Sequence, residues 1–355
     1  MSLSLLATTL EVVILCFIFL AALFGNLSLY IIVYKNKNLQ TIINLYILNL
    51  AAADIMVSVL SIPFTVVTVI AGRWLFGDIA CVALGFLTIL SFIASVMSLG
   101  MIAINRYFYI VKWNTYKKTF SKKKSFLYAA AVWVVSISLA SPPLFGWVEY
   151  RFIPGKSYCF VNWPSNVYFM YFMITVCFFG PLSVMAFSYY NILTFTKNLK
   201  RRIAVSRNYV APTPVHHEPT CTCTAEEKTQ NDNPDDIKAE TPGIKRKEEG
   251  TFEMTLRSKP KFQITPEENK ITNMFLYVVA LFIICWAPFV ITMFLEVYYS
   301  RPLPHAVDIG SLLLGYLNSI CNPILYGLHT STFKQGFLDL YSKFLPKRFQ
   351  PTNGT

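Results

Sequence analysis

A single carboxylate, Asp54, interrupts a stretch of the sequence (39–72) that otherwise lacks charged residues. Ionisable side chains are costly in apolar surroundings and usually mark function there. Small polar residues of two other apolar stretches could converge on it, namely Ser95, Asn318, Ser319 and Asn322. Carboxylate, hydroxyl and amide oxygens suit a hard cation, so this set predicts a site for a small ion such as sodium. A purely structural hydrogen-bond network is the alternative.

Imidazole and thiol groups gather elsewhere in the chain. His216, His217, Cys221 and Cys223 lie in a polar, proline-bearing segment that is poor in large apolar residues. These side chains could bind zinc, but their spacing fits no familiar zinc site. We therefore expect a disordered loop there, with a metal site as the alternative.

The elements that would position these residues are membrane helices. Of the 355 residues, 54% are hydrophobic and 14% are charged, and the mean hydropathy is +0.47. A bilayer core of ~30 Å needs about 20 apolar residues in a helix. Seven such stretches occur, at 12–34, 39–72, 79–105, 125–148, within 157–196, 271–295 and 309–330. The fold predicted is an all-α membrane protein, a bundle of seven transmembrane helices.

Basic residues indicate which side each loop faces. If 35–40, 106–124, 197–270 and the tail face the cytoplasm, only Arg73, Arg151, Lys156 and Arg301 remain outside, which leaves 31 − 4 = 27 of the Lys and Arg residues inside. This is the bias expected of cytoplasmic loops, and it places the N-terminus outside. The net charge of +12 is then accounted for by topology and by attraction to anionic lipid, and we expect no nucleic-acid partner.

The chain divides accordingly. We expect an extracellular N-terminus (1–11) without a cleaved signal peptide, helices one to five with their loops (12–196), a largely disordered cytoplasmic loop (197–268), helices six and seven (269–330), and a short amphipathic helix with a tail (331–355). Phe333, Phe337, Leu340 and Phe344 recur at helical spacing in this last segment, which favours a helix on the membrane surface. Cys81 and Cys159 would both face the oxidising outer side, so a disulfide between them is the simplest pairing.

Signature residues occur in every one of the seven expected helices and in order. They are Asn26 in "GNLSLY", Asp54 in "LNLAAAD", Cys81, "NRY" at 105–107, Trp133, Pro181, "CWAP" at 285–288 and "NPILY" at 322–326. With these motifs in this order, the chain resembles the rhodopsin-like (class A) G-protein-coupled receptors. The resemblance covers the whole length apart from the long loop and the last few residues.

The resemblance implies an activation switch. Arg106, at the inner end of the third helix, would hold the resting state by pairing with Glu268 of the sixth helix, and would meet Tyr189, Tyr326 and the G protein when active. Trp286, Pro288 and Asn322 would relay the change. Asn105 stands where the family usually has an acid, and an amide cannot neutralise a guanidinium, so we expect a resting state that leans more on Glu268.

Two branches of the family are similar to this chain. "GMIAINRYFYI" is similar to melatonin receptors, and "PPLFGW" and "ITNMFLYVVALFIICWAPF" are similar to opsins. Tyr316 occupies the place of the retinal-binding lysine, and no lysine occurs between Arg301 and Lys334, so a retinal cofactor is not expected. Thr88 occupies the place of the aspartate that pairs with amine ligands, which argues against biogenic amines.

The expected ligand pocket is mostly apolar, with charges only at its mouth (Glu149, Glu296, His305 and Asp308). Its wall would comprise Thr88, Ile89, Phe92, Met173, Cys177, Phe289, Val290, Met293, Leu312 and Tyr316. Such a wall suits a small neutral or lipophilic ligand.

We therefore expect a plasma-membrane receptor with no catalytic chemistry, which passes an outer signal to heterotrimeric G proteins and contacts membrane lipid. A photoreceptor with non-standard retinal binding and a transporter or channel are the alternatives.

Overall fold

The computed structural model describes residues 2–209, 265–299 and 303–342. The chain divides into two units, residues 1–198 with 264–355 and residues 199–263. The elements below belong to the first unit, apart from the last turns of α8, which belong to the second. The histidine and cysteine cluster at 216–223, the body of the long loop and the tail beyond 342 lie outside the described residues.

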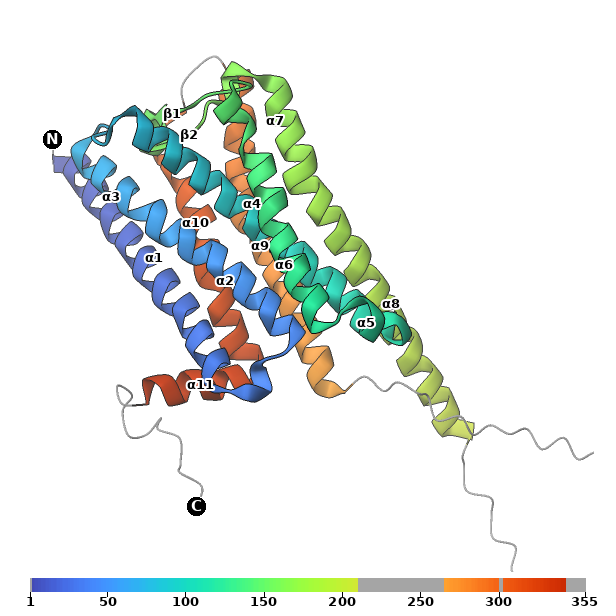
Figure 1. Ribbon diagram of the computed structural model, residues 1–355. Helices are drawn as coiled ribbons and strands as arrows, with labels where there is room; N and C mark the ends of the chain where they lie inside the picture. The colour runs from blue at the N-terminus through green and yellow to red at the C-terminus, as the bar shows by residue number, and fades with distance from the viewer. Residues whose placement is uncertain (1, 210–264, 300–302, 343–355) are drawn as a thin grey trace, which may run out of the picture. The chain divides into compact units, whose positions relative to one another are not determined.

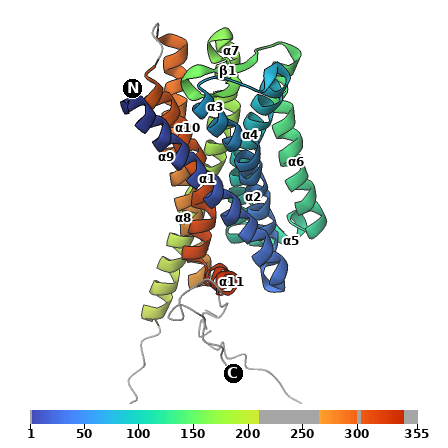
Figure 2. The same cartoon turned by 90° about the vertical axis from the view of Figure 1, so that its left-hand side faces the viewer.

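Seven long helical segments lie within the described residues, and Figures 1 and 2 show those of the first unit running alongside one another. They are α1 (Ser2–Lys35), α2 (Ile42–Leu60) continued by α3 (Ile62–Ala71), α4 (Gly77–Ile110), α6 (Lys122–Ala140), α7 (Val167–Met173) continued through a π-helical segment (Ile174–Phe179) into α8 (Gly180–Tyr209), α9 (Pro266–Tyr298) and α10 (His305–His329). Two shorter helices are α5 (Trp113–Thr119) and α11 (Ser331–Tyr341). Single 3-10 turns occupy Lys37–Leu39, Pro142–Phe145, Pro154–Lys156 and Trp163–Ser165.

Within the described residues, six of these segments are long and apolar enough to cross a membrane. The seventh, α10, has 25 residues and is more polar because it carries Asn318, Ser319 and Asn322, which are buried inside the bundle. The bundle of seven helices expected from the sequence is confirmed. Residues 2–11, expected ahead of the first helix, are helical and continuous with α1, since no glycine or proline interrupts them.

Local sequence signals set the ends and bends of the helices. The Thr41 and Ser121 side chains accept hydrogen bonds from the backbone N–H groups at the starts of α2 and α6, as capping residues do. α2 breaks at Ser61, just before Pro63. Pro288 lies inside α9 and Pro323 inside α10, where each removes a backbone hydrogen bond and permits a bend.

The bundle buries polar side chains and turns large apolar ones outward. Asn26, Asp54 and Asn322 are each at most 2% exposed, whereas Phe17 on α1 is 64% exposed. This inverts the pattern of a soluble protein and fits an exterior covered by lipid, where polar groups must find partners inside the protein.

A β-hairpin covers one end of the bundle, and α11 lies at the other (Figures 1 and 2). Its strands β1 (Tyr150–Ile153) and β2 (Tyr158–Val161) are antiparallel, with Phe152 opposite Cys159. Cys159 forms a disulfide with Cys81 at the start of α4, which confirms the expected pairing. We call the end of the bundle under the β-hairpin the hairpin end. The opposite end, where α11 lies, is the Arg106 end, after the arginine of α4.

A buried lysine also fastens the hairpin to the helices. Lys156, between the two strands, is 2% exposed, forms an ion pair with Glu296 of α9, and has its Nζ 3.8 Å from a carboxylate oxygen of Asp308 of α10. Its ammonium also lies 5.4 Å from the centre of the Phe289 ring. We refer to Lys156, Glu296 and Asp308 as the hairpin latch.

A second set of contacts runs beside the latch. His305 of α10 forms hydrogen bonds with the Gly155 carbonyl at 2.8 Å and with the Glu11 carboxylate of α1 at 3.2 Å. The hairpin is thus held to α4 by a covalent bond and to α9 and α10 by charged and polar groups. Burial lowers the pKa of Lys156 to about 8, against the opposing pull of Asp308.

Removing one partner of the latch should loosen the hairpin. We expect Glu296→Ala to destabilise the fold by about 3 kcal/mol, because it leaves a buried lysine with only one carboxylate, whereas the double variant Lys156→Met/Glu296→Leu should recover most of that loss. Thermal unfolding and hydrogen exchange of the hairpin amides would measure both effects. Unchanged exchange in Glu296→Ala would show that the latch does not hold the hairpin.

The pH dependence of the folding stability tests the assignment of Lys156 independently. The pKa of Lys156 is about 8 in the fold and 10.5 ordinarily, so between these values the unfolded chain binds more protons. Stability should therefore rise as the pH increases from about 8 towards 10.5 and should gain nothing from this residue below about 8. Lys156→Met should lack that contribution, so a pH profile identical to that of the wild type would contradict the assignment.

Candidate functional site

Arg106 lies near the C-terminal end of α4, where it is buried, 4% exposed, and bonds to α9. Its Nη2 donates to the Glu268 backbone carbonyl at 3.2 Å and to Thr272 Oγ1 at 3.1 Å. The guanidinium carbon lies 5.3 Å from the centre of the Tyr109 ring. A cation at the end of one helix thus holds the first two turns of another through charge-assisted hydrogen bonds.

The expected ion pair between Arg106 and the Glu268 carboxylate is not formed, and the sequence-based pairing is corrected here. The carboxylate accepts hydrogen bonds from Thr265 N and from the Tyr109 hydroxyl, both at 2.9 Å. Thr265 Oγ1 accepts from Glu268 N in return at 3.2 Å, which completes a capping box at the start of α9. The helix start therefore engages the acid, and only its backbone reaches Arg106.

Asn105 likewise does not bond to the guanidinium. It is 1% exposed, and its amide donates to the Tyr116 hydroxyl of α5 at 3.3 Å. The amide that replaces the usual acid thus ties α4 to the short helix that follows it. Arg106 depends on α9 for its polar partners among the described residues.

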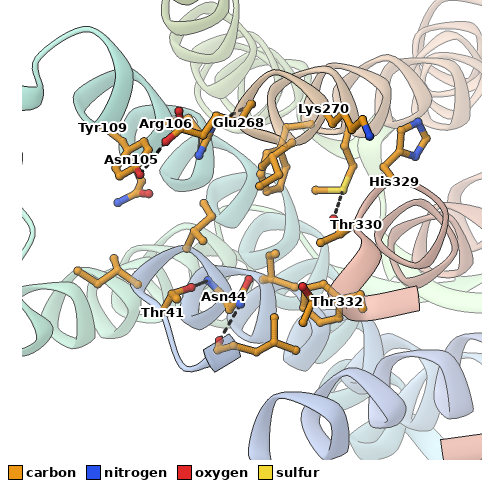
Figure 3. Close-up of a pocket in the computed structure, with 18 of the residues that line it drawn as sticks. Thr41, Asn44, Asn105, Arg106, Tyr109, Glu268, Lys270, His329, Thr330 and Thr332 are labelled. Atoms are coloured by element: carbon orange, nitrogen blue, oxygen red, sulfur yellow. Dashed lines mark hydrogen bonds between the residues drawn. The ribbon is translucent and has the colours of Figure 1, made fainter. Parts of the chain in front are cut away.

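A cavity of about 420 Å³ opens beside these groups at the Arg106 end. Figure 3 shows Asn105, Arg106 and Tyr109 of α4 next to Glu268 of α9, with Thr41 and Asn44 on the opposite side of the cavity. Its other walls come from the α1–α2 connection, α2, α5, α10 and α11. The switch residues therefore lie on a hollow surface that a peptide or helix could enter.

The two switch tyrosines are buried. Tyr189 of α8 is 4% exposed, and Tyr326 of α10 is fully buried. The Tyr326 ring packs against Phe275 and Phe333, with centroid distances of 6.2 and 6.1 Å, and its hydroxyl has no hydrogen-bond partner among the described residues. Within that part of the chain no hydrogen bond joins either tyrosine to the arginine.

Asp54 lies at the centre of the bundle and is 2% exposed. Its two oxygens accept hydrogen bonds from Ser319 Oγ at 3.0 Å and from Asn322 Nδ2 at 2.8 Å. The Ser95 hydroxyl is buried without a partner in the described chain, and Asn318 is also buried. This donor set fits a sodium ion, and the sodium site stays a prediction, which a comparison of unfolding temperatures in sodium and choline salts would test.

Trp286 connects the centre of the bundle to the hairpin end. Its ring contacts Phe92 of α4 at a centroid distance of 4.4 Å and Phe289 at 5.7 Å, and Pro288 lies two residues further along α9. A displacement of Phe92 would therefore press directly on Trp286 where α9 can bend.

A smaller cavity, about 100 Å³, lies among α4, α7 with its π-helical continuation, and α9. Seven of the residues expected to line a pocket do so: Ile89, Phe92, Met173, Cys177, Phe289, Val290 and Met293. The other three, Thr88, Leu312 and Tyr316, do not line this cavity, and their place in a ligand pocket stays a prediction. Thr88 donates to Ser61 Oγ at 3.2 Å, the Tyr316 hydroxyl bonds to the same oxygen at 2.6 Å, and Leu312 is fully buried. The Ser61 hydroxyl, at the break between α2 and α3, thus joins Thr88 and Tyr316 in one buried hydrogen-bonded cluster.

Sequence reasoning missed the contribution of the hairpin to this site. Phe160 and Trp163 line the cavity, and Phe160 lies next to the disulfide residue Cys159. The position of Phe160 beside this cysteine could have predicted the contact, because a disulfide that joins a loop to α4 places the neighbouring loop residues over the bundle. In the sequence, Lys156 counted only as one of the basic residues outside the membrane, and no sequence pattern predicts its burial.

Comparisons with known proteins agree with this architecture. Residues 25–326 match the family model of the 7 transmembrane receptor (rhodopsin family). The chain is 27% identical to the alpha-1D adrenergic receptor of Mus musculus over 90% of its own length and 55% of that receptor, and 28% identical to the 5-hydroxytryptamine receptor 1B of Homo sapiens over 95% and 87%. It therefore spans about half the length of the adrenergic receptors that it matches.

A solved structure supports the fold. Squid rhodopsin superposes with a TM-score of 0.70 at 20% identity, covering 98% of this chain and 89% of that one. At this identity the likeness concerns the arrangement of helices alone. Together with the match to the family model over most of the sequence, it leads to one conclusion: the chain belongs to the rhodopsin family of seven-transmembrane receptors.

Proposed function

We propose that this protein is a plasma-membrane receptor that transmits an outer signal to heterotrimeric G proteins. The observation that carries the proposal is the pair of hydrogen bonds from Arg106 to the first turns of α9, beside a cavity of about 420 Å³. A group that is buried, charged and bonded to a helix that can bend is suited to a two-state switch.

We place the Arg106 end in the cytoplasm and the hairpin end, with the N-terminus, outside. Lysines of the described residues support this, since Lys35 ends α1 and Lys37 follows it, and Lys112, Lys117 and Lys118 follow α4. Short loops rich in lysine face the cytoplasm in membrane proteins. The disulfide at the opposite end fits an oxidising exterior.

The ligand we propose is small and neutral or lipophilic. The cavity under the hairpin is lined by aliphatic, aromatic and sulfur-containing side chains. Lys156, whose ammonium lies 5.4 Å from the ring of the lining residue Phe289, is engaged with Glu296 and Asp308. A cationic amine would therefore meet no free carboxylate on the wall, although the adrenergic and 5-hydroxytryptamine relatives are named for amines.

Activation would proceed from the ligand cavity to the Arg106 end. A ligand that favours a displaced Phe92 moves Trp286, which packs on it at 4.4 Å. Bending at Pro288 then swings the first turns of α9, and Arg106 loses the Glu268 carbonyl and Thr272. The freed guanidinium would be available to a G-protein segment in the enlarged cavity.

Basal G-protein activation by the full chain in membranes tests this function. Thr272→Val should raise basal nucleotide exchange by at least about tenfold, because it removes a hydrogen bond to a charged group, worth about 1.5–3 kcal/mol. Arg106→Ala should abolish exchange. Thr68→Val serves as the matched control, since within the described part of the chain the Thr68 hydroxyl bonds only to the Phe64 carbonyl of its own helix, α3.

The outcomes separate clearly. A rise in Thr272→Val that disappears in the double variant with Arg106→Ala supports the switch. If Thr272→Val behaves like Thr68→Val across a panel of G proteins, while an agonist still activates the wild type, the resting contact is assigned to the wrong residue. Activity that persists in Arg106→Ala would contradict the proposed role of the guanidinium.

A further inference from the structure

An apolar groove runs along the outside of the bundle where α1, α10 and α11 meet. It has a volume of about 630 Å³ and lies apart from the two cavities described above. Phe17 of α1 and Ile324 and Leu328 of α10 contribute to its wall and are 64%, 53% and 71% exposed. On a surface that faces lipid, such a groove is open to a molecule from the bilayer.

Close helix packing builds the groove. A Cβ atom on Gly25 of α1 would come within 2.8 Å of the Pro323 ring of α10, and one on Gly336 of α11 within 2.4 Å of the Ile32 side chain. Ser28 of α1 and Tyr341 of α11 share a hydrogen bond of 2.6 Å. The absence of side chains at the two glycines lets the three helices meet, and the hydrogen bond fixes α11 against α1.

The dimensions suit one lipid tail. From Phe17 to Gly25 the wall extends eight residues along α1, which is about 12 Å at 1.5 Å per residue. Half of a bilayer core of ~30 Å is about 15 Å. The groove therefore covers most of the depth of one leaflet, ending at α11, an amphipathic helix of the kind that lies at a membrane surface.

The charge is placed at one end only. Lys334 of α11 is the one ionisable cation on the groove wall and is exposed. In the part of the chain that the structure describes it makes no ion pair, and Asp339, on the same helix, accepts a hydrogen bond from Gln335 at 2.7 Å. An apolar channel with an ammonium at its surface end complements an amphiphile with a negative head.

We propose that this groove binds an anionic glycerophospholipid of the leaflet in which α11 lies, with one acyl chain along Phe17, Ile324 and Leu328 and the headgroup at Lys334. Such a lipid would bridge α1, α10 and α11 and would stabilise the position of α11, whose Phe333 packs against the switch residue Tyr326. The inference does not depend on the receptor's ligand or on its G protein.

The test uses the full chain in phosphatidylcholine nanodiscs that contain a small fraction of phosphatidylserine or phosphatidylcholine carrying a photoactivatable acyl chain. Mass spectrometry then quantifies labelling of α10 and α11 peptides. We expect phosphatidylserine to label them about fivefold more than phosphatidylcholine, the effect of one lysine near an anionic lipid. Lys334→Gln should remove this preference.

Two further variants keep the test decisive. Lys117→Gln removes an exposed lysine of α5 elsewhere at the Arg106 end and should leave the preference intact. Ile324→Trp, which fills the groove, should reduce labelling by both lipids while the unfolding temperature stays unchanged.

Equal effects of Lys334→Gln and Lys117→Gln would overturn the proposal in favour of general attraction to the basic end. Unchanged labelling in Ile324→Trp would overturn the acyl-chain assignment. The assignment would also fail if added cholesterol, without any competing phospholipid, displaced the labelled phospholipid.

Discussion

Polar groups inside a bundle with an apolar exterior must find their partners in other helices, and the rest of the structure depends on this constraint. Lipid competes with apolar packing but not with hydrogen bonds, so interhelical polar contacts determine how the helices register. Asn26 of α1 donates to the Ser319 carbonyl of α10 at 2.9 Å. Asn49 of α2 donates to Ser98 of α4 at 2.9 Å and accepts from Trp133 of α6 at 2.8 Å. Asp54 joins α2 to α10.

The two ends of the bundle are held differently, and this difference fits a receptor. At the hairpin end a disulfide and the hairpin latch hold the β-hairpin over a small apolar cavity. At the Arg106 end, among the described residues, α9 is hydrogen-bonded to α4 only through the guanidinium and Tyr109. A few hydrogen bonds can break and reform at modest cost, whereas a disulfide and a buried ion pair cannot. Motion is therefore expected at the Arg106 end, with Pro288 as the pivot.

Much of this could be predicted from the sequence because hydrophobic length, proline and isolated polar residues report directly on membrane helices. The seven helices, the Cys81–Cys159 pairing and the contacts of Asp54 with Ser319 and Asn322 follow from such signals. The predicted ion pair between Arg106 and the Glu268 carboxylate is not formed, because "TPEE" at 265–268 forms a capping box that engages this carboxylate. That capping box could have been predicted from the four residues alone. The burial of Lys156 and the bonds of Thr88 and Tyr316 to Ser61 depend on how distant segments meet, which no local pattern encodes.

The central claim is that Arg106 holds α9 in the resting position through the Glu268 carbonyl and Thr272. The most direct test is the distance distribution between spin-labelled noncanonical residues at Lys117 of α5 and Lys270 of α9, both exposed, in the wild type, Thr272→Val and the control Thr68→Val. We predict one narrow distribution for the wild type and the control, and a second, longer population in Thr272→Val. Identical distributions in all three proteins would contradict the claim.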